Sequence, residues 1–198
     1  MKKILYVVDV QYDFMKGGAL AVPDAEAIIP VINELIRSGK YDTVFFTKDF
    51  HPTNHTSFAS EHGVPPFTEV DGEIKWPSHC IGSTKGAELN AEITVPAELT
   101  ERVNVLLKGT NPFLEEYSGY SLKIQSSPEI GQFVQSWIRG SEIDVVGLAI
   151  DYCVCFTALD LVKQATVNVL LEGCRGVDPD STVTAIAKMK EQGVNIID

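Results

Sequence analysis

The sequence lacks several features that would place it in a specialised class of protein. No apolar run is long enough to span a bilayer, and there are no repeats, low-complexity tracts or obvious linkers. Four cysteines in 198 residues are too few for a disulfide framework, so we expect free thiols in a cytoplasmic protein. The basic start Met1-Lys2-Lys3 is typical of a signal peptide, but Asp9 interrupts the apolar stretch too early for one.

Basic residues are also scarce. The chain has 16 Lys and Arg against 27 Asp and Glu, which gives a net charge of −11. Nucleic acids and anionic membranes both require clusters of Lys and Arg, so we expect neither as a partner. The charge favours a small neutral or cationic ligand.

The sequence does contain the material for a folded core. Its length fits a single domain over residues 1–198, and 44% of the residues are hydrophobic. Apolar runs predict strands at residues 3–10, 43–48, 102–108, 143–150, 167–173 and 194–197. Amphipathic stretches predict helices at residues 25–40, 129–140, about 153–165 and 180–193. This alternation predicts an α/β fold with a doubly wound, mostly parallel sheet of about six strands flanked by helices.

Residues 50–100 break the alternation. This stretch holds five of the ten prolines and all four histidines, and it shows little periodicity. So long an irregular segment is usually functional, so we expect a binding loop there.

Chemically active residues follow the predicted strands. Asp9 ends the first strand, Asp49 and His51 end the second, Lys108 ends the third, and Cys153 follows the fourth. In a parallel sheet the carboxyl ends of all strands lie along one edge, where ligands bind. We therefore expect an acid, a metal-type pair, a lysine and a thiol to meet there.

The thiol has a functional and a structural interpretation. A free cysteine is usually a small buried hydrophobe, Asp9 alone would fit a turn cap, and Lys108 alone would fit a solvated strand end. However, Cys153 lies at a predicted helix start, where the positive end of the helix and a nearby lysine favour the thiolate. We expect Lys108 to act on this thiol electrostatically and Asp9 to accept its proton.

The histidines of the loop suggest a metal site. Asp49 and His51 stand two residues apart at a strand end, and His79 comes from the far end of the loop. One carboxylate and two imidazoles suit zinc, iron or manganese, and His55 is a candidate further ligand. The alternative is that these histidines cap loop backbone groups. We expect Cys80 to be packed rather than ligating, and we expect the remaining loop histidine, His62, to be solvated.

Five stretches together resemble a known family. These are "VDVQYDF…GGALAV", "TKDFHPTNHTSF", "WPSHC", "KGTNPFLEEYSGY" and "GLAIDYCV". In order and spacing they resemble the nicotinamidase/pyrazinamidase branch of the isochorismatase-like hydrolases over nearly the whole chain. The resemblance implies a cytoplasmic amide hydrolase of NAD salvage with that family's three-layer fold. Family members are monomers, dimers or larger, so a homo-oligomer is an open expectation.

The resemblance also implies catalytic roles. Cys153 would attack the carboxamide carbon of nicotinamide, and Asp9 would move the thiol proton to the leaving ammonia. Lys108 would hold both groups in their charged forms. The backbone N–H groups of Ala149 and Cys153 would form the oxyanion hole. A non-proline cis peptide would lie at Ala149–Ile150.

The substrate pocket follows from the same resemblance. A divalent metal, zinc first, with iron or manganese as alternatives, would bind the pyridine nitrogen. Its ligands would be Asp49, His51 and His79, with His55 joining in some members. Aromatic walls map to Phe14 and Trp76, with Tyr117, Tyr120 and Tyr152 as further lining residues. Pyrazinamide would be accepted as well as nicotinamide.

Cys155 follows Cys153 by two residues, which places the two side chains on roughly opposite faces of a helix. We therefore interpret Cys155, like Cys174, as a passive packed thiol.

Rival functions remain at this point. One is a cysteine amidase for carbamoyl or ureido compounds, a group that commonly lacks the metal pair. Isochorismate hydrolysis fits less well because it needs no thiol. A non-catalytic metal-binding or thiol-redox protein would give no reason for Asp9 and Lys108 at two other strand ends.

Overall fold

A computed structural model gives the fold and describes residues 1–120 and 128–198. Its centre is a six-stranded sheet in the order β5-β2-β1-β6-β7-β8. All neighbouring pairs in this sheet are parallel. The strands are β1 (Lys3–Val8), β2 (Thr43–Asp49), β5 (Val103–Lys108), β6 (Glu142–Leu148), β7 (Thr166–Arg175) and β8 (Asn195–Ile197). The predicted α/β fold with a doubly wound sheet is confirmed.

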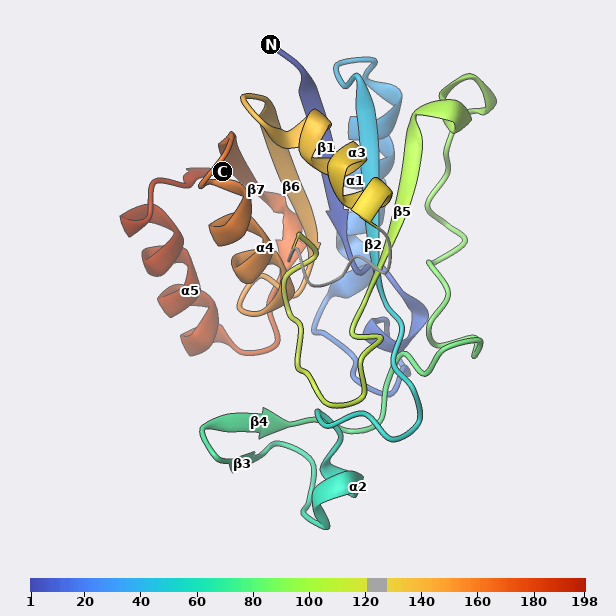
Figure 1. Cartoon of the computed structure of the whole chain (residues 1–198), viewed down its shortest axis with the longest axis vertical. Coiled ribbons are helices and arrows are strands. Elements are labelled where there is room, and N and C mark those ends of the chain that lie inside the picture. Colours follow the sequence, from blue (N-terminus) through green and yellow to red (C-terminus); the bar gives the residue numbers. More distant parts are fainter. Residues whose placement is uncertain (121–127) are drawn as a thin grey trace.

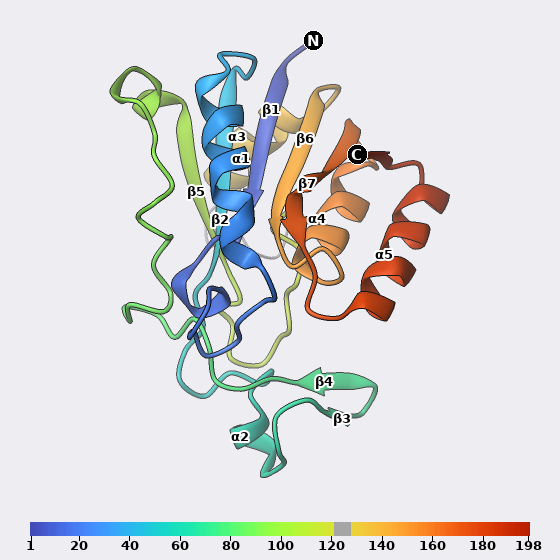
Figure 2. The ribbon, with the colours of Figure 1, turned by 180° about the vertical axis from the view of Figure 1, so that it is seen from behind.

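Helices cover both faces of the sheet. Helix α1 (Ile28–Arg37) lies on one face, as Figure 2 shows, and three helices lie on the other, as Figure 1 shows. Those three are α3 (Pro128–Ile138), α4 (Cys153–Leu161) and α5 (Pro179–Glu191). Among the described residues, no helix has the length and apolarity needed to cross a membrane.

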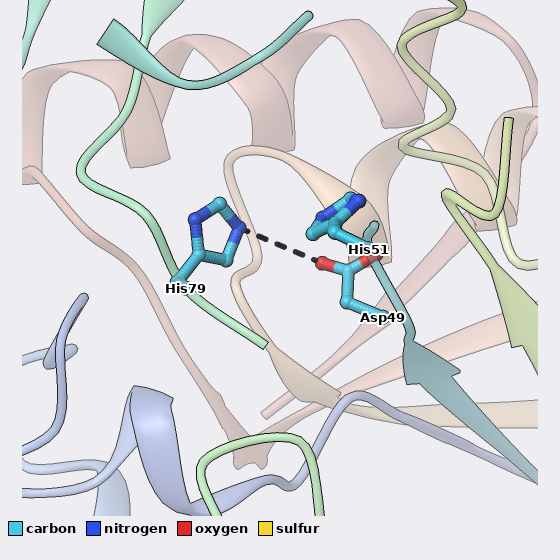
Figure 3. Close-up of side chains that lie close together, drawn as sticks. All are labelled: Asp49, His51 and His79. Carbon is cyan, nitrogen blue, oxygen red and sulfur yellow. Dashed lines mark ion pairs between the residues drawn. The ribbon is translucent and has the colours of Figure 1, made fainter. Parts of the chain in front are cut away.

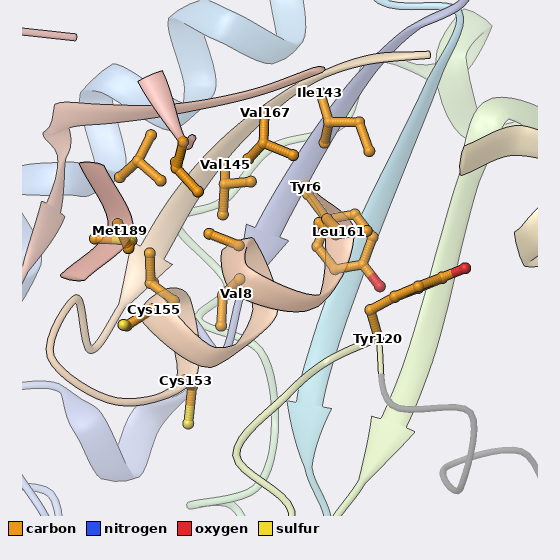
Figure 4. Close-up of a cluster of buried hydrophobic side chains, with 14 of the residues drawn as sticks. Tyr6, Val8, Tyr120, Ile143, Val145, Cys153, Cys155, Leu161, Val167 and Met189 are labelled. Atoms are coloured by element: carbon orange, nitrogen blue, oxygen red, sulfur yellow. The ribbon is translucent and has the colours of Figure 1, made fainter. Parts of the chain in front are cut away.

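The periodicity of β1 explains the two layers. Tyr6 and Val8 point into the core under α3, α4 and α5, part of which Figure 4 shows. Leu5 and Val7 point into the second core under α1, and all four side chains are fully buried. Such a strand, covered on both faces, has to be a continuous apolar run rather than an alternating one.

The chain order places a switch point beside β1. From β1 the chain adds β2 and β5 on one side, then returns to add β6, β7 and β8 on the other. The ends of β1 and β6 therefore flank the position where ligands bind in such sheets.

Short elements interrupt the long loop. Helix α2 (Ala59–His62) and the antiparallel pair β3 (Thr68–Val70) and β4 (Glu73–Lys75) form an arm beyond the carboxyl ends of the main strands, as Figures 1 and 2 show. The described residues also include three 3-10 turns, at Tyr12–Phe14, Ala25–Ala27 and Ala97–Arg102.

Candidate active site

Four strand ends deliver chemically active side chains to one point. Asp9 follows β1, Asp49 is the last residue of β2, Lys108 is the last residue of β5, and Cys153 opens α4 after β6. Their exposed fractions range from 0% to 7%. The parallel sheet thus brings an acid, a second acid, a cation and a thiol together away from bulk water.

Lys108 lies at the centre of this group. Its Nζ lies 2.9 Å from Asp9 Oδ2 and donates a 2.5 Å hydrogen bond to Asp49 Oδ1. It also donates to the sulfur of Cys153 at 3.3 Å. One buried ammonium therefore offsets two buried carboxylates and contacts the thiol.

Asp9 is held by its neighbour on β2. The hydroxyl of Thr47 donates to Asp9 Oδ1 at 2.6 Å and accepts the N–H of Asp9 at 3.2 Å. Within the described part of the chain, Asp9 Oδ2 is paired with Lys108 and accepts no further hydrogen bond. An Asp9 oxygen and Cys153 Sγ lie within 4.8 Å of each other. Burial raises the pKa of Asp9 against the pull of Lys108, which makes its carboxylate a stronger base.

The thiol differs from the expectation of a favoured thiolate. Burial raises the pKa of Cys153 well above its usual value, and the carboxylates of Asp9 and Asp49 add to the effect. The Lys108 ammonium opposes this shift without overcoming it. The resting thiol therefore keeps its proton, and chemistry at sulfur requires a base such as Asp9.

The turn before the thiol carries one correction. The cis peptide bond lies at Leu148–Ala149, one bond earlier than the predicted Ala149–Ile150. Strand β6 ends at Leu148, so the turn to α4 begins one residue sooner than the motif indicated. The N–H of Cys153 is the first of α4, where helix starts leave N–H groups without intrahelical partners.

A second cluster adjoins the first. Asp49, His51 and His79 each offer one ligand atom, all within 4.8 Å of one another. His51 Nε2 lies 3.6 Å from Asp49 Oδ1, and His79 Nε2 lies 3.9 Å from Asp49 Oδ2. Figure 3 shows both imidazole rings beside this carboxylate.

The Nδ1 atoms of His51 and His79 are each held by a backbone carbonyl, as is usual for histidines that bind a metal through Nε2. His51 Nδ1 lies 2.9 Å from the carbonyl of Gly109, and His79 Nδ1 lies 2.8 Å from the carbonyl of Pro77. A carbonyl only accepts, so each Nδ1 carries a proton, and Nε2 is the atom that would bind a metal, losing any proton of its own when it does. The three residues therefore fit a divalent metal.

The charges of the cluster suit a cation. Although burial acts in the other direction, Lys108 and His51 hold the pKa of Asp49 well below its usual range. Burial, together with the charge of His51, lowers the pKa of His79 to about 4. A permanent carboxylate beside a neutral imidazole is what a divalent metal needs.

The two other loop histidines lie outside this cluster. His55 Nδ1 is 2.7 Å from the hydroxyl of Ser57, and its Nε2 is 3.1 Å from the carbonyl of Leu114. The centre of its ring lies 4.2 Å from that of His51, so His55 packs against a residue of the cluster without belonging to it. His62 is exposed, as expected, and its Nε2 donates to the carbonyl of Thr56 at 2.7 Å.

Both clusters open into one cavity with aromatic walls. Four predicted aromatic residues line it, namely Phe14, Trp76, Tyr117 and Tyr152, together with Ala149 of the predicted oxyanion hole. Trp76 donates from Nε1 to the hydroxyl of Tyr117 at 3.1 Å and meets Tyr152 edge-on at 4.8 Å. Tyr120, a further expected lining residue, instead packs in the core, where Gln164 donates to its hydroxyl at 3.0 Å.

Sequence reasoning missed four lining residues of this cavity: Leu20, Val22, Glu115 and Val177. Three of them lie within or beside the motif stretches, in "GGALAV" and "PFLEEYSGY". Glu115 is the chemically notable one, since burial raises the pKa of its carboxyl and the nearby Asp49 adds to the shift.

The other three cysteines are packed. Cys80, Cys155 and Cys174 are buried free thiols. Figure 4 shows the side chains of Cys153 and Cys155 leaving α4 in different directions, with that of Cys155 directed toward α5.

Known proteins are similar in sequence to this chain over almost its whole length. The Isochorismatase domain model matches residues 3–198. The chain belongs to the isochorismatase family. It is 38% identical to the nicotinamidase of Escherichia coli, over 98% of this chain and 93% of the relative.

Solved structures agree with this assignment. The nicotinamidase/pyrazinamidase of Acinetobacter baumanii is 37% identical, with a TM-score of 0.85 over 100% of this chain and 96% of that one. The pyrazinamidase of Pyrococcus horikoshii in complex with zinc is 34% identical, with a TM-score of 0.80 over 100% and 99%. The family predicted from the motifs is confirmed.

Proposed function

We propose that this protein is a nicotinamidase, which hydrolyses nicotinamide to nicotinate and ammonia. The observation that carries the proposal is that the Cys153 thiol and the Asp49, His51 and His79 cluster line one aromatic cavity. Nicotinamide has a carboxamide for the thiol to attack, a flat aromatic ring that fits between aromatic walls, and a basic ring nitrogen that a metal can bind. The named activity of the similar proteins supports the same substrate.

The chemistry begins at the thiol. Asp9 takes the proton of Cys153, and the thiolate attacks the carboxamide carbon to give a tetrahedral intermediate. We propose that the N–H groups of Ala149 and Cys153 stabilise its oxyanion. Asp9 then gives the proton to the amide nitrogen, the C–N bond breaks, and ammonia leaves a thioester. Water, activated by Asp9, hydrolyses the thioester and releases nicotinate.

Lys108 makes these proton transfers energetically accessible by stabilising the negative charges in the site. Its ammonium, within 3.3 Å of Asp9, Asp49 and Cys153, lowers the cost of forming a thiolate beside the Asp49 carboxylate. It also orients Asp9 toward the sulfur. When Asp9 takes the proton, the negative charge moves from Asp9 to the sulfur, and the ammonium 3.3 Å away stabilises it there.

The substrate ring is positioned by the second cluster. We propose that Asp49, His51 and His79 hold a divalent metal, with zinc as its identity, and that His55 supports the site through His51. When bound, such an ion supplies a Lewis acid for the ring nitrogen. Phe14, Trp76, Tyr117 and Tyr152 would enclose the ring by stacking and edge contacts. Pyrazinamide, which has a second ring nitrogen, fits the same arrangement.

We propose that the whole chain is one domain of this family, which the span of the family match supports. We also propose a cytoplasmic enzyme of NAD salvage. The four cysteines are all free and buried, as a reducing compartment permits.

The test is ammonia release from nicotinamide by purified protein. The protein is assayed as prepared, after treatment with a chelator, and after addition of zinc, iron or manganese. We expect chelation to abolish turnover and metal to restore it. Benzamide, which lacks the ring nitrogen, is the matched control and should be a poor substrate in every state. The absence of nicotinamide turnover with any metal, together with turnover of a carbamoyl or ureido amide, would overturn the proposal.

A further inference from the structure

Two side chains that follow Asp9, those of Gln11 and Asp13, hydrogen-bond to the backbone at or next to the residues of the metal cluster. Gln11 is fully buried, and its side-chain amide bonds to backbone groups on two other segments. Its Nε2 donates to the carbonyl of Asp49 at 2.8 Å and to that of Ala87 at 3.0 Å. Its Oε1 accepts the N–H of Asp49 at 2.8 Å. The Gln11 carboxamide thus hydrogen-bonds to both the carbonyl and the N–H of Asp49.

Asp13 holds the backbone next to His79, another residue of the metal cluster. Its Oδ2 accepts the N–H of Cys80, the residue after His79, at 2.7 Å. Cys80 has a φ of 46°, in the left-handed region that a non-glycine residue adopts only when its surroundings hold it there. Gly86 packs so closely that a Cβ at this position would lie 2.1 Å from Asp13 Oδ2.

We propose that Gln11 and Asp13 are positioning residues of the metal site, Gln11 acting through the backbone of Asp49 and Asp13 through the turn that carries His79. This inference rests on the metal binding of the proposed function. Side chains that orient metal ligands typically contribute about 10- to 100-fold to metal affinity. Because Gln11 also donates its N–H to the carbonyl of Asp9 at 2.9 Å, one short segment would align the base and the metal ligands together.

Two variants test the proposal at separate points. Gln11→Glu keeps the shape and the acceptor but turns a carboxylate toward the two carbonyls that the amide served. Gly86→Ala leaves the side chain of Asp13 intact but places a methyl group where its carboxylate lies. Asn33→Asp is the control, since the Asn33 amide also bridges a loop, donating to the carbonyl of Glu92 and accepting the N–H of Thr94, both at 2.8 Å.

The measurement is the dissociation constant of zinc, obtained by competition with a chromophoric chelator in the absence of nicotinamide. Thermal unfolding of the metal-free proteins is followed in parallel. We expect Gln11→Glu and Gly86→Ala to weaken zinc binding about 10- to 100-fold, and Asn33→Asp to leave it unchanged. If Gln11→Glu does not fold, Gln11→Met, which removes the same hydrogen bonds without adding a charge, takes its place, and Gly86→Ala decides the part that concerns Asp13.

Folded variants that bind zinc within about twofold of the parent protein would overturn the proposal, since a merely structural role lowers the unfolding temperature without changing zinc affinity. A parent protein that binds no zinc would overturn it as well. Zinc binding without nicotinamide hydrolysis would refute the proposed enzyme and leave this inference standing.

Discussion

Replacement of Lys108 by methionine tests the electrostatic basis of the site. The lysine side chain is 1% exposed, and Nζ lies 2.9 Å from Asp9 Oδ2 and 2.5 Å from Asp49 Oδ1. Methionine keeps much of the volume but leaves both carboxylates without their cation. Removal of one partner from a buried ion pair costs about 3–5 kcal/mol, out of about 5–15 kcal/mol for a typical domain. We expect a folded variant whose free energy of unfolding is lower by about this amount.

The loss should depend on pH. Burial already raises the pKa of Asp9 against the opposing effect of Lys108, so the variant should raise it further. A carboxyl whose pKa is raised by folding stabilises the fold below its unfolded pKa, and this contribution is lost as the pH rises through the folded pKa. Asp49, whose low pKa depends on Lys108, loses its advantage in the same variant. The deficit relative to the parent should therefore shrink as the pH falls from about 7 to about 5.

Urea unfolding, followed by circular dichroism at both pH values, measures the deficit. Addition of Asp9→Asn to Lys108→Met should recover part of the lost stability, because one of the stranded carboxylates becomes neutral. Ammonia release from nicotinamide should fall on the order of a thousandfold in the single variant. A variant as stable as the parent, or one whose deficit does not change with pH, would refute the reasoning.

Three further predictions concern the thiol, the metal and the turn that precedes Cys153. Cys153→Ala should abolish ammonia release while circular dichroism and zinc content stay unchanged, and Cys155→Ser should remain active; loss of activity in Cys155→Ser would mean that the wrong thiol was chosen. His51→Ala should lower zinc content after dialysis, measured by metal analysis, whereas unchanged occupancy would contradict the ligand assignment. Asp151 Oδ2 accepts the N–H of Asp178 at 3.1 Å and the hydroxyl of Ser181 at 2.6 Å, and Asp151→Asn, which turns an NH2 group toward these donors, should lower the free energy of unfolding by about 1–3 kcal/mol in a urea titration. A change below about 0.5 kcal/mol would count against those two contacts.

Much of this architecture follows from local patterns. The apolar runs that end at Asp9, Asp49 and Lys108 predict strands, and alternation with helices makes them parallel, so their ends have to meet. The positions of these residues at one edge of the sheet therefore needed no tertiary information. The family could also be predicted, because five motif stretches occur in this chain in the order and at the spacing typical of that family.

Other properties arise only when the chain is packed. The charge state of Cys153 depends on burial, which raises the pKa of the thiol and outweighs the opposing effect of Lys108. The grip of Gln11 on Asp49 joins residues 38 positions apart through a side-chain amide, which no periodicity signals. The place of the cis bond at Leu148–Ala149 depends on where β6 ends, and strand ends are the least predictable part of any pattern.

The parallel sheet also has a consequence for how activity arises during folding. The contacts of Lys108 with Asp49 and Cys153 join positions 59 and 45 residues apart, so every one requires a long loop to close. Such non-local contacts form late and slowly, and here β5, β2, β1 and β6 all have to be paired before the four groups meet. No fragment or half-assembled chain can carry a working centre. Turnover is thus a reporter of the complete native sheet, and during refolding it should return only after the helical signal has recovered.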